Sequence, residues 1–133
     1  MTRALREREP ASRTYLSQGL RLHYLDWGNP GAPLLLLVHG ISDHARSWDQ
    51  TARALCREWH VVTPDLRGHG DSAWSPDKSY LNSCYLVDIA NLMASLPHER
   101  TAVVAHSLGG NIMARHTAIF PDQVAKLVLT RTI

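Results

Sequence analysis

Four short apolar runs are separated along the chain by segments in which apolar residues recur every three or four positions. Runs of this length without a polar interruption are typical of strands buried on both faces of a sheet, and the intervening period is that of helices. The runs cover residues 34–38, 60–63, 101–105 and 126–130. Strands that alternate with helices predict a mainly parallel sheet with helices on both faces, so the sequence indicates an α/β fold.

The segments between these runs have the spacing of amphipathic helices. A helix is predicted near residues 45–57, where Trp48 lies on the apolar face. A second helix carries one apolar face from Leu81 to Leu96 and ends before Pro97, because proline cannot continue a helix. The third includes Met113, Thr117 and Phe120 and stops at Pro121.

The N-terminal part has a different pattern. Residues 20–24 alternate between apolar and polar side chains, which predicts a half-buried strand. We expect residues 13–17 to pair with it as a β-hairpin, with the turn at Gln18-Gly19. Residues 1–12 carry charges of both signs and are interpreted as an N-terminal arm, and residues 13–133 as one domain.

The charge balance and the apolar content exclude several classes of protein. Fourteen Lys+Arg against twelve Asp+Glu give a net charge of +2, which argues against a nucleic-acid partner. The longest apolar stretch, residues 32–38, is far below the ~20 residues of a membrane-spanning helix, and the N-terminus lacks the apolar segment of a signal peptide. Cys56 and Cys84 have no metal-ligand spacing, so we expect reduced thiols in a cytoplasmic protein.

The residues that follow the apolar runs are the candidates for function. In sheets of this kind, ligands bind beyond the carboxyl ends of the strands. Polar or glycine-rich segments follow three of the runs, at residues 39–41, 64–72 and 106–110. We expect these three segments to meet at one edge of the sheet.

Ser107 stands between the third apolar run and the helix after it. A serine on so sharp a turn has a strained backbone, and its hydroxyl is raised above the sheet as a nucleophile. Small residues are needed two positions before and two after, where Ala105 and Gly109 stand. The amide of Leu108 begins the helix, where free N–H groups favour an anion. The simpler alternative is that Gly109-Gly110 only starts a helix that Ser107 caps.

The segment His39-Gly40-Ile41 independently favours a nucleophilic Ser107. Gly40 allows the backbone to turn across the top of the sheet, so that the amide of Ile41 points at the same oxyanion as the amide of Leu108. One such donor contributes about 3–4 kcal/mol to transition-state stabilisation. The alternative is a turn that merely ends a strand. His39 is interpreted as a structural hydrogen-bonding residue rather than a base.

These segments resemble the α/β-hydrolase family from about Tyr15 to Leu129. The blocks that match are residues 34–40, 65–72, 106–110 and 120–129. The resemblance implies that Ser107 is the nucleophile, that Ile41 and Leu108 supply the backbone oxyanion donors, and that residues 65–72 form a shaped loop without a catalytic role. It disfavours the dehalogenase and epoxide-hydrolase branches, which carry an aspartate at this turn.

Two features depart from the family pattern. Ala105 replaces the usual glycine, which is a small change in size. The family's triad places an acid and then a histidine after the serine, and this chain has neither; Arg131 and Thr132 stand where some members carry the acid. We therefore expect an incomplete α/β-hydrolase core, an N-terminal half truncated before the last strands and the lid. His44 and His69 are the candidates for a surrogate base.

Two functional hypotheses remain open. The first is a serine hydrolase that cleaves a small ester-like substrate through an acyl-enzyme, without cofactor or metal; esterase, lipase, C–C hydrolase and acyltransferase chemistry all fit. The second is an inactive fragment, or a half-domain that needs a partner chain. Ile41, Leu108 and Trp74 are candidates for an apolar acyl site, and Trp48 is assigned to the core. Self-association is expected through the apolar edge strand 126–130.

Overall fold

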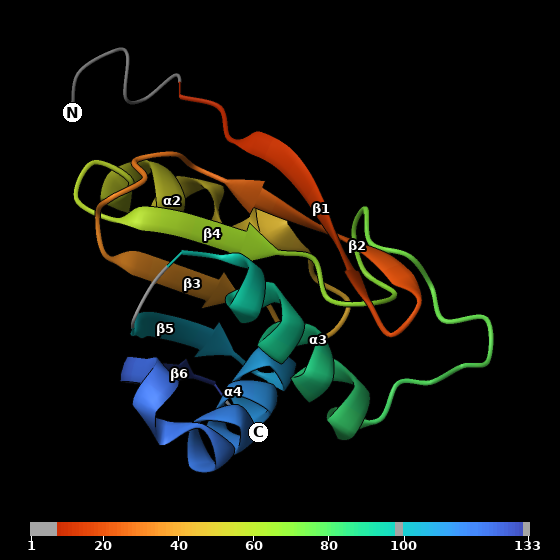
Figure 1. Cartoon of the computed structure of the whole chain (residues 1–133). Helices are drawn as coiled ribbons and strands as arrows, with labels where there is room; N and C mark the ends of the chain where they lie inside the picture. The colour runs from red at the N-terminus through yellow and green to blue at the C-terminus, as the bar shows by residue number, and fades with distance from the viewer. Residues whose placement is uncertain (1–7, 98–99, 132–133) are drawn as a thin grey trace.

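A six-stranded sheet forms the centre of the molecule (Figure 1). The computed structural model describes residues 8–97 and 100–131. Its spatial order is β1-β2-β4-β3-β5-β6; the last four strands in this order run parallel, whereas β2 is antiparallel to β4 and β1 to β2. The strands are β1 Ala11–Ser17, β2 Leu20–Asp26, β3 Leu34–Val38, β4 His60–Pro64, β5 Thr101–His106 and β6 Val124–Thr130.

Helices cover both faces of this sheet, as the alternating pattern predicts. The helical elements are the 3-10 helix η1 Ala45–Trp48, α2 Asp49–Leu55, α3 Asn82–Ser95, α4 Leu108–Ile119 and the 3-10 helix η2 Pro121–Gln123. One core cluster joins α3 and α4 to β3, β4 and β5, and a second joins η1 and α2 to the other face. Trp48 packs against the second cluster, the core role assigned to it. The α/β fold class is therefore confirmed.

Several boundaries differ from the sequence prediction. Strand β2 continues to Asp26 and β6 begins at Val124, and β6 is a largely exposed edge strand, so the prediction that residues 126–130 are buried on both faces is wrong. Strand β1 begins at Ala11, so two residues assigned to the arm pair with β2, Ala11 opposite Asp26 and Ser12 opposite Leu25. Its side chains are mostly exposed on an edge strand, which removes the apolar alternation that marks a strand. The predicted helix at 45–57 is two elements, η1 and then α2, and it ends at Leu55. Residues 1–7 of the arm lie outside the described residues.

A buried ion pair fixes the loop after β4 against α3. The Arg67 guanidinium donates to both carboxylate oxygens of Asp88, from Nε at 2.6 Å and from Nη2 at 2.9 Å. Ser17 and Gln18 at the hairpin turn donate to the same carboxylate, at 2.6 and 3.0 Å. The Asp88 hydrogen bonds raise the pKa of Arg67 against the opposing effect of burial. Loss of one partner from such a pair costs about 3–5 kcal/mol.

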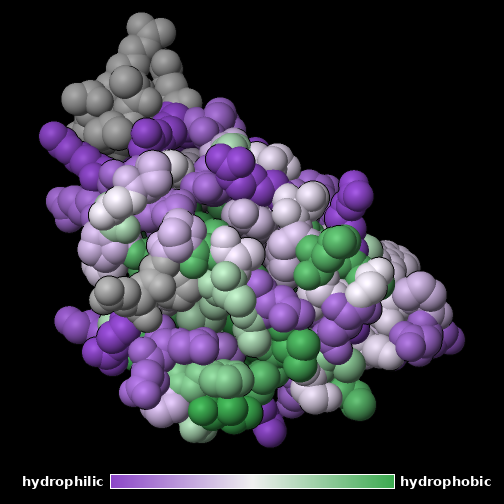
Figure 2. All heavy atoms as spheres, in the orientation of Figure 1, coloured by the Kyte–Doolittle hydropathy of each residue, from purple (hydrophilic) through white to green (hydrophobic). Residues whose placement is uncertain are grey.

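Apolar side chains remain exposed on the C-terminal strand and on the helices beside it. Figure 2 shows apolar side chains gathered over α3 and α4 at the lower end of the view. Strand β6 is the edge of the sheet, and Val128 and Leu129 on it are 53% and 43% exposed. Among the described residues, none of the helices has the length and apolar character needed to cross a membrane. The thiols of Cys56 and Cys84 are free.

Self-association through β6 stays a prediction, and the exposed side chains of Val128 and Leu129 indicate where to test it. An unpaired apolar edge binds a second copy strand to strand, and a lysine on it disfavours that pairing. We expect light scattering to show dimers or larger species for the parent chain and mainly monomer for Val128→Lys. Val87→Lys, a matched change at an exposed valine of α3, leaves the association unchanged. A monomeric parent chain, or monomer formation only in Val87→Lys, contradicts the prediction.

The buried ring of His116 predicts that stability depends on pH. Its two ring nitrogens have no hydrogen-bond partner among the described residues, and burial lowers the pKa of this side chain. Below pH ~6.5 the unfolded chain binds a proton at His116 that the folded chain does not, so this side chain makes stability decrease as the pH is lowered, by at most about 1.4 kcal/mol per pH unit. Burial lowers the pKa of His39 as well, so His39 adds a slope of the same sign.

Urea unfolding between pH 7 and pH 5 measures this slope. We expect His116→Leu to show a smaller loss of stability over this range than the parent chain, because the leucine cannot bind the proton. Val87→Leu, which changes no titratable group at an exposed position of α3, serves as the control with an unchanged slope. Equal slopes in His116→Leu and the parent would show that His116 does not titrate differently on folding.

Candidate active site

The backbone of Ser107 has an unusual conformation. Its φ of 53° and ψ of −114° are those of the first central residue of a type II′ turn, a position normally taken by glycine. The residue joins β5 to α4, and its side chain makes no capping hydrogen bond to the helix. Holding the backbone of a residue other than glycine in so sparsely populated a φ/ψ region costs about 1–3 kcal/mol. Ser107 is therefore not an ordinary helix cap, which removes the simpler alternative.

Close packing of α4 against the end of β3 explains this turn. A Cβ placed on Gly109 would lie 2.6 Å from the carbonyl oxygen of His39 and 2.7 Å from that of Val38. Only a glycine allows the helix to begin this close to the strand. On the other side of the turn, Ala105 is fully buried and pairs with Val38. The small residues expected two positions on either side of Ser107 therefore lie where the packing requires them.

The segment after β3 crosses directly beside the turn. A Cβ placed on Gly40 would lie 3.0 Å from the Cβ of Ser107 and 3.1 Å from the ring of His106. The next amide is that of Ile41, which donates no hydrogen bond to any described residue. Leu108 is the first residue of α4, so its amide has no partner within the helix. The packing brings both expected donor residues close to Ser107, and their catalytic role stays a prediction.

Strand β6 holds the turn from the opposite side. The carbonyl of Thr130 accepts a hydrogen bond from the amide of Ser107 at 3.1 Å. The Nδ1 atom of His106 lies 3.0 Å from the Thr130 hydroxyl and 3.1 Å from its carbonyl. Sequence reasoning missed Thr130, because a threonine that ends a strand belongs to no motif.

His39 has a structural position. Its Nδ1 donates to the carbonyl of Gly40 at 2.7 Å, and its Nε2 accepts from the amide of Leu66 at 3.0 Å. The ring thus connects the end of β3 to the end of β4, and burial lowers its pKa. With both nitrogens occupied, His39 acts as the structural hydrogen-bonding residue that the sequence indicates.

Neither candidate for a surrogate base contacts Ser107. His44 is exposed just before η1, and His69 uses its Nδ1 on the carbonyl of Arg67 while its ring packs on that of His39. Within the described ranges, no imidazole or carboxylate is hydrogen-bonded to the Ser107 hydroxyl. Arg131, with a φ of 43°, follows β6 where some family members carry the acid; Thr132 lies outside the described residues.

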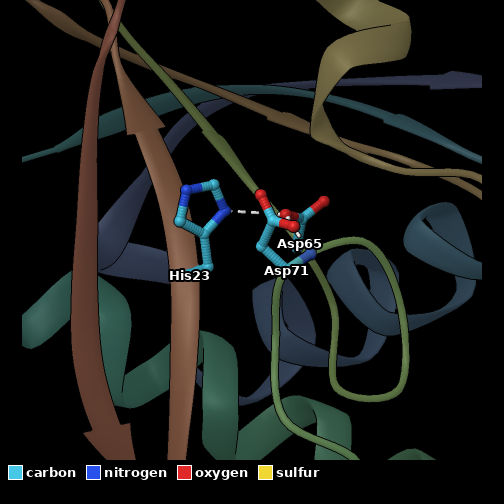
Figure 3. A group of neighbouring side chains, drawn as sticks. All are labelled: His23, Asp65 and Asp71. Atoms are coloured by element: carbon cyan, nitrogen blue, oxygen red, sulfur yellow. Dashed lines mark hydrogen bonds and ion pairs between the residues drawn. The ribbon is translucent and has the colours of Figure 1, made fainter.

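The loop after β4 is shaped by a buried carboxylate. Asp65 accepts the amides of Ala45 at 2.7 Å and Asp71 at 3.0 Å, and pairs with the ring of His23 at 2.7 Å (Figure 3). A Cβ on Gly70 would fall 2.2 Å from that carboxylate, so glycine is required there. His23, Asp65 and Asp71 bring three metal-type ligand atoms within 4.8 Å. The Asp65 oxygens are already occupied by N–H donors, which gives this loop a structural role.

The candidate residues for an acyl site differ in exposure. Ile41 is 68% and Trp74 75% exposed, whereas Leu108 packs against the core of α3 and α4. Ile41 follows Gly40, whose backbone packs closely beside Ser107. Contacts of the segment before Trp74 are with the hairpin, since the amide of Ala73 donates to the carbonyl of Arg21 at 3.1 Å. A substrate-binding role for the three residues stays a prediction.

Known proteins are similar to this chain in sequence. A family model described as the alpha/beta hydrolase fold matches residues 33–132. Epoxide hydrolase 4 of Mus musculus is 36% identical over 112 residues, which are 84% of this chain and 31% of that protein. The 3-hydroxybutyrate-oligomer hydrolase of Cupriavidus necator is 35% identical over 111 residues, 82% of this chain and 38% of that protein.

Solved structures agree with these sequence relatives. The crystal structure of an alpha/beta hydrolase from Novosphingobium aromaticivorans superposes with a TM-score of 0.85 at 34% identity, and the match covers 91% of this chain and 44% of that one. The chain thus spans 31% to 44% of the length of these three relatives. The family match, the order of the strands and the strained turn at Ser107 together show that this chain belongs to the α/β-hydrolase fold family.

Proposed function

We propose that Ser107 is the nucleophile of a serine hydrolase that transfers the acyl group of an ester-like substrate to water. The observation that carries this proposal is the backbone conformation of Ser107, a φ of 53° at a residue that is not glycine. Such backbone strain persists only where the surrounding structure imposes it, and it is concentrated at active sites and ligand-binding sites. The residue is only half-buried, so its hydroxyl is within reach of a substrate.

The proposed oxyanion donors are the amides of Ile41 and Leu108. When Ser107 attacks a carbonyl carbon, negative charge develops on the carbonyl oxygen, and amides already in place stabilise it without reorganisation. The start of α4 adds the positive end of its helix dipole. Gly40 supports this assignment, because the residue before Ile41 packs so closely on Ser107 that a Cβ on it would lie 3.0 Å from the Cβ of Ser107.

The chemistry of serine favours acyl substrates over epoxides. Attack of a serine oxygen on an epoxide carbon would leave an ether, which water does not hydrolyse, whereas attack on an ester leaves an acyl-enzyme that water cleaves. Ser107 therefore separates this chain from the activity in the name of epoxide hydrolase 4. Hydroxy acids oligomerise through ester bonds, so the relative named for hydroxybutyrate oligomers is the nearer chemical analogue.

A second candidate is a half-domain that acts only with a partner chain, or an inactive fragment. The observation that favours it is the absence of a base on Ser107 among the described residues. In serine proteases, loss of the triad leaves on the order of 10³–10⁴-fold catalysis over water. We propose that the acid and the base of the reaction come from outside this chain.

Two further parts of the proposal concern cofactors and localisation. We propose that the reaction uses no cofactor or metal, and that the protein is cytoplasmic.

Covalent labelling with a fluorophosphonate tests the role of Ser107. We expect the folded chain to be labelled on the tryptic peptide 101–115, slowly because no base assists the serine, and Ser107→Ala to abolish that label. Addition of the C-terminal segment that follows the matched region in a family member, as a separate chain, is expected to raise the labelling rate by about 10²–10⁴-fold, the usual contribution of a general base.

The controls separate chemistry from folding. Circular dichroism of Ser107→Ala establishes that the variant is folded, and the urea-unfolded parent gives the labelling rate of an ordinary serine. A folded parent chain whose peptide 101–115 reacts no faster than in urea contradicts a nucleophilic Ser107. Activation by the added segment in Ser107→Ala would place the reactive group elsewhere.

A further inference from the structure

A serine, a histidine and an aspartate are linked in series at a second place in the molecule. The Oγ atom of Ser12 on β1 lies 2.5 Å from Nε2 of His23 on β2. The other ring nitrogen, Nδ1, lies 2.7 Å from the Asp65 carboxylate, which follows β4. Figure 3 shows the His23 ring pointing at this carboxylate. The hydrogen bonds that these three side chains make among the described residues do not include Ser107.

The carboxylate fixes the direction of one hydrogen bond. A carboxylate only accepts, so Nδ1 of His23 is the donor to Asp65, and in the neutral imidazole the lone pair of Nε2 is left for the Ser12 hydroxyl. The carboxylate is held in place by the amides of Ala45 and Asp71, and His23 itself by the Ser72 hydroxyl on its amide at 2.8 Å. The ring is therefore oriented as a base that faces Ser12.

Burial divides this group into a shielded base and an accessible hydroxyl. His23 and Asp65 are 5% and 3% exposed, whereas Ser12 is exposed on the edge strand β1. In the strand register Thr14 stands opposite His23 and Ser12 opposite Leu25, so Ser12 reaches the ring as a diagonal neighbour on the same face. A structural link between the hairpin and the loop needs only the His23–Asp65 contact. The Ser12 hydroxyl is a further, accessible member of this hydrogen-bond network.

We propose that Ser12 is a second nucleophilic hydroxyl, an acceptor of acyl groups from activated esters, with His23 as its general base and Asp65 as the residue that positions His23. A hydroxyl bonded to a base that a third group orients is the arrangement that activates serine. Ser12 lies in a regular strand without the helix start that serves Ser107, so it accepts one acyl group and releases it slowly.

The step balances within these three residues and the ester. The Ser12 oxygen forms a bond to the acyl carbon of an aryl ester, and the bond from that carbon to the phenolic oxygen breaks. The Ser12 proton passes to Nε2 of His23 and from there to the departing phenolate. The products are O-acyl Ser12 and the free phenol, with His23 neutral again.

Acylation of the Ser107→Ala chain with p-nitrophenyl acetate tests the proposal without interference from the turn. Trypsin cleaves after Arg8 and Arg13, and the peptide 9–13 that results has Ser12 as its single hydroxyl, so mass spectrometry localises the acetyl group without ambiguity. Ser83, exposed on α3, is the internal control. We expect acetylation of Ser12 at least tenfold faster than that of Ser83, and loss of this preference in His23→Gln.

Unfolding provides a test that does not depend on a variant. In urea the network is lost, so Ser12 and Ser83 are expected to react at similar rates, even if His23→Gln fails to fold. Equal rates at the two serines in the folded chain overturn the proposal. A Ser12 preference that survives in urea, or in a folded His23→Gln chain, also overturns it, because the imidazole is then not the base. The outcome at peptide 101–115 does not affect this reading.

Discussion

The approach of α4 to the end of β3 is the constraint on which the site depends. Gly109 brings the first turn of the helix against two carbonyl oxygens of the strand, and Gly40 brings the next segment against Ser107. Between these contacts the chain has room only for a tight turn with a positive φ. Residue size at two glycines thus determines where Ser107 lies at this edge of the sheet.

Buried polar interactions hold the surrounding loops in register with that turn. The carboxylate of Asp88, on α3, accepts hydrogen bonds from Arg67 and from the hairpin turn. The carboxylate of Asp65 accepts hydrogen bonds from Ala45, Asp71 and His23. Each connects elements distant in sequence at the carboxyl end of the strands. A polar group buried without partners is costly, so these satisfied carboxylates favour one arrangement of the loops over others.

The sequence predicts the parts of this structure that depend on local pattern. Apolar runs give β3, β4 and β5, and small residues around Ser107 give the turn, because both signals lie within a few positions. Long-range partners leave no such signal: Arg67 meets Asp88 across 21 positions, and His23 meets Asp65 across 42. Polar β1 is likewise paired through tertiary contact, so its start at Ala11 is not visible in the pattern. Neither the sequence pattern nor the structure of the described residues supplies a general base for Ser107.

The stability of Ser107→Gly measures the strain at the turn most directly. Relief of the strained φ is worth about 1–3 kcal/mol, and the greater freedom of glycine in the unfolded chain costs about 0.4–1 kcal/mol. We therefore expect urea unfolding to show the glycine variant more stable than the parent by roughly 1 kcal/mol. An ordinary serine cap loses a few tenths of a kcal/mol on the same change. A variant less stable than the parent would mean that Ser107 is unstrained, and the account of the site would fail.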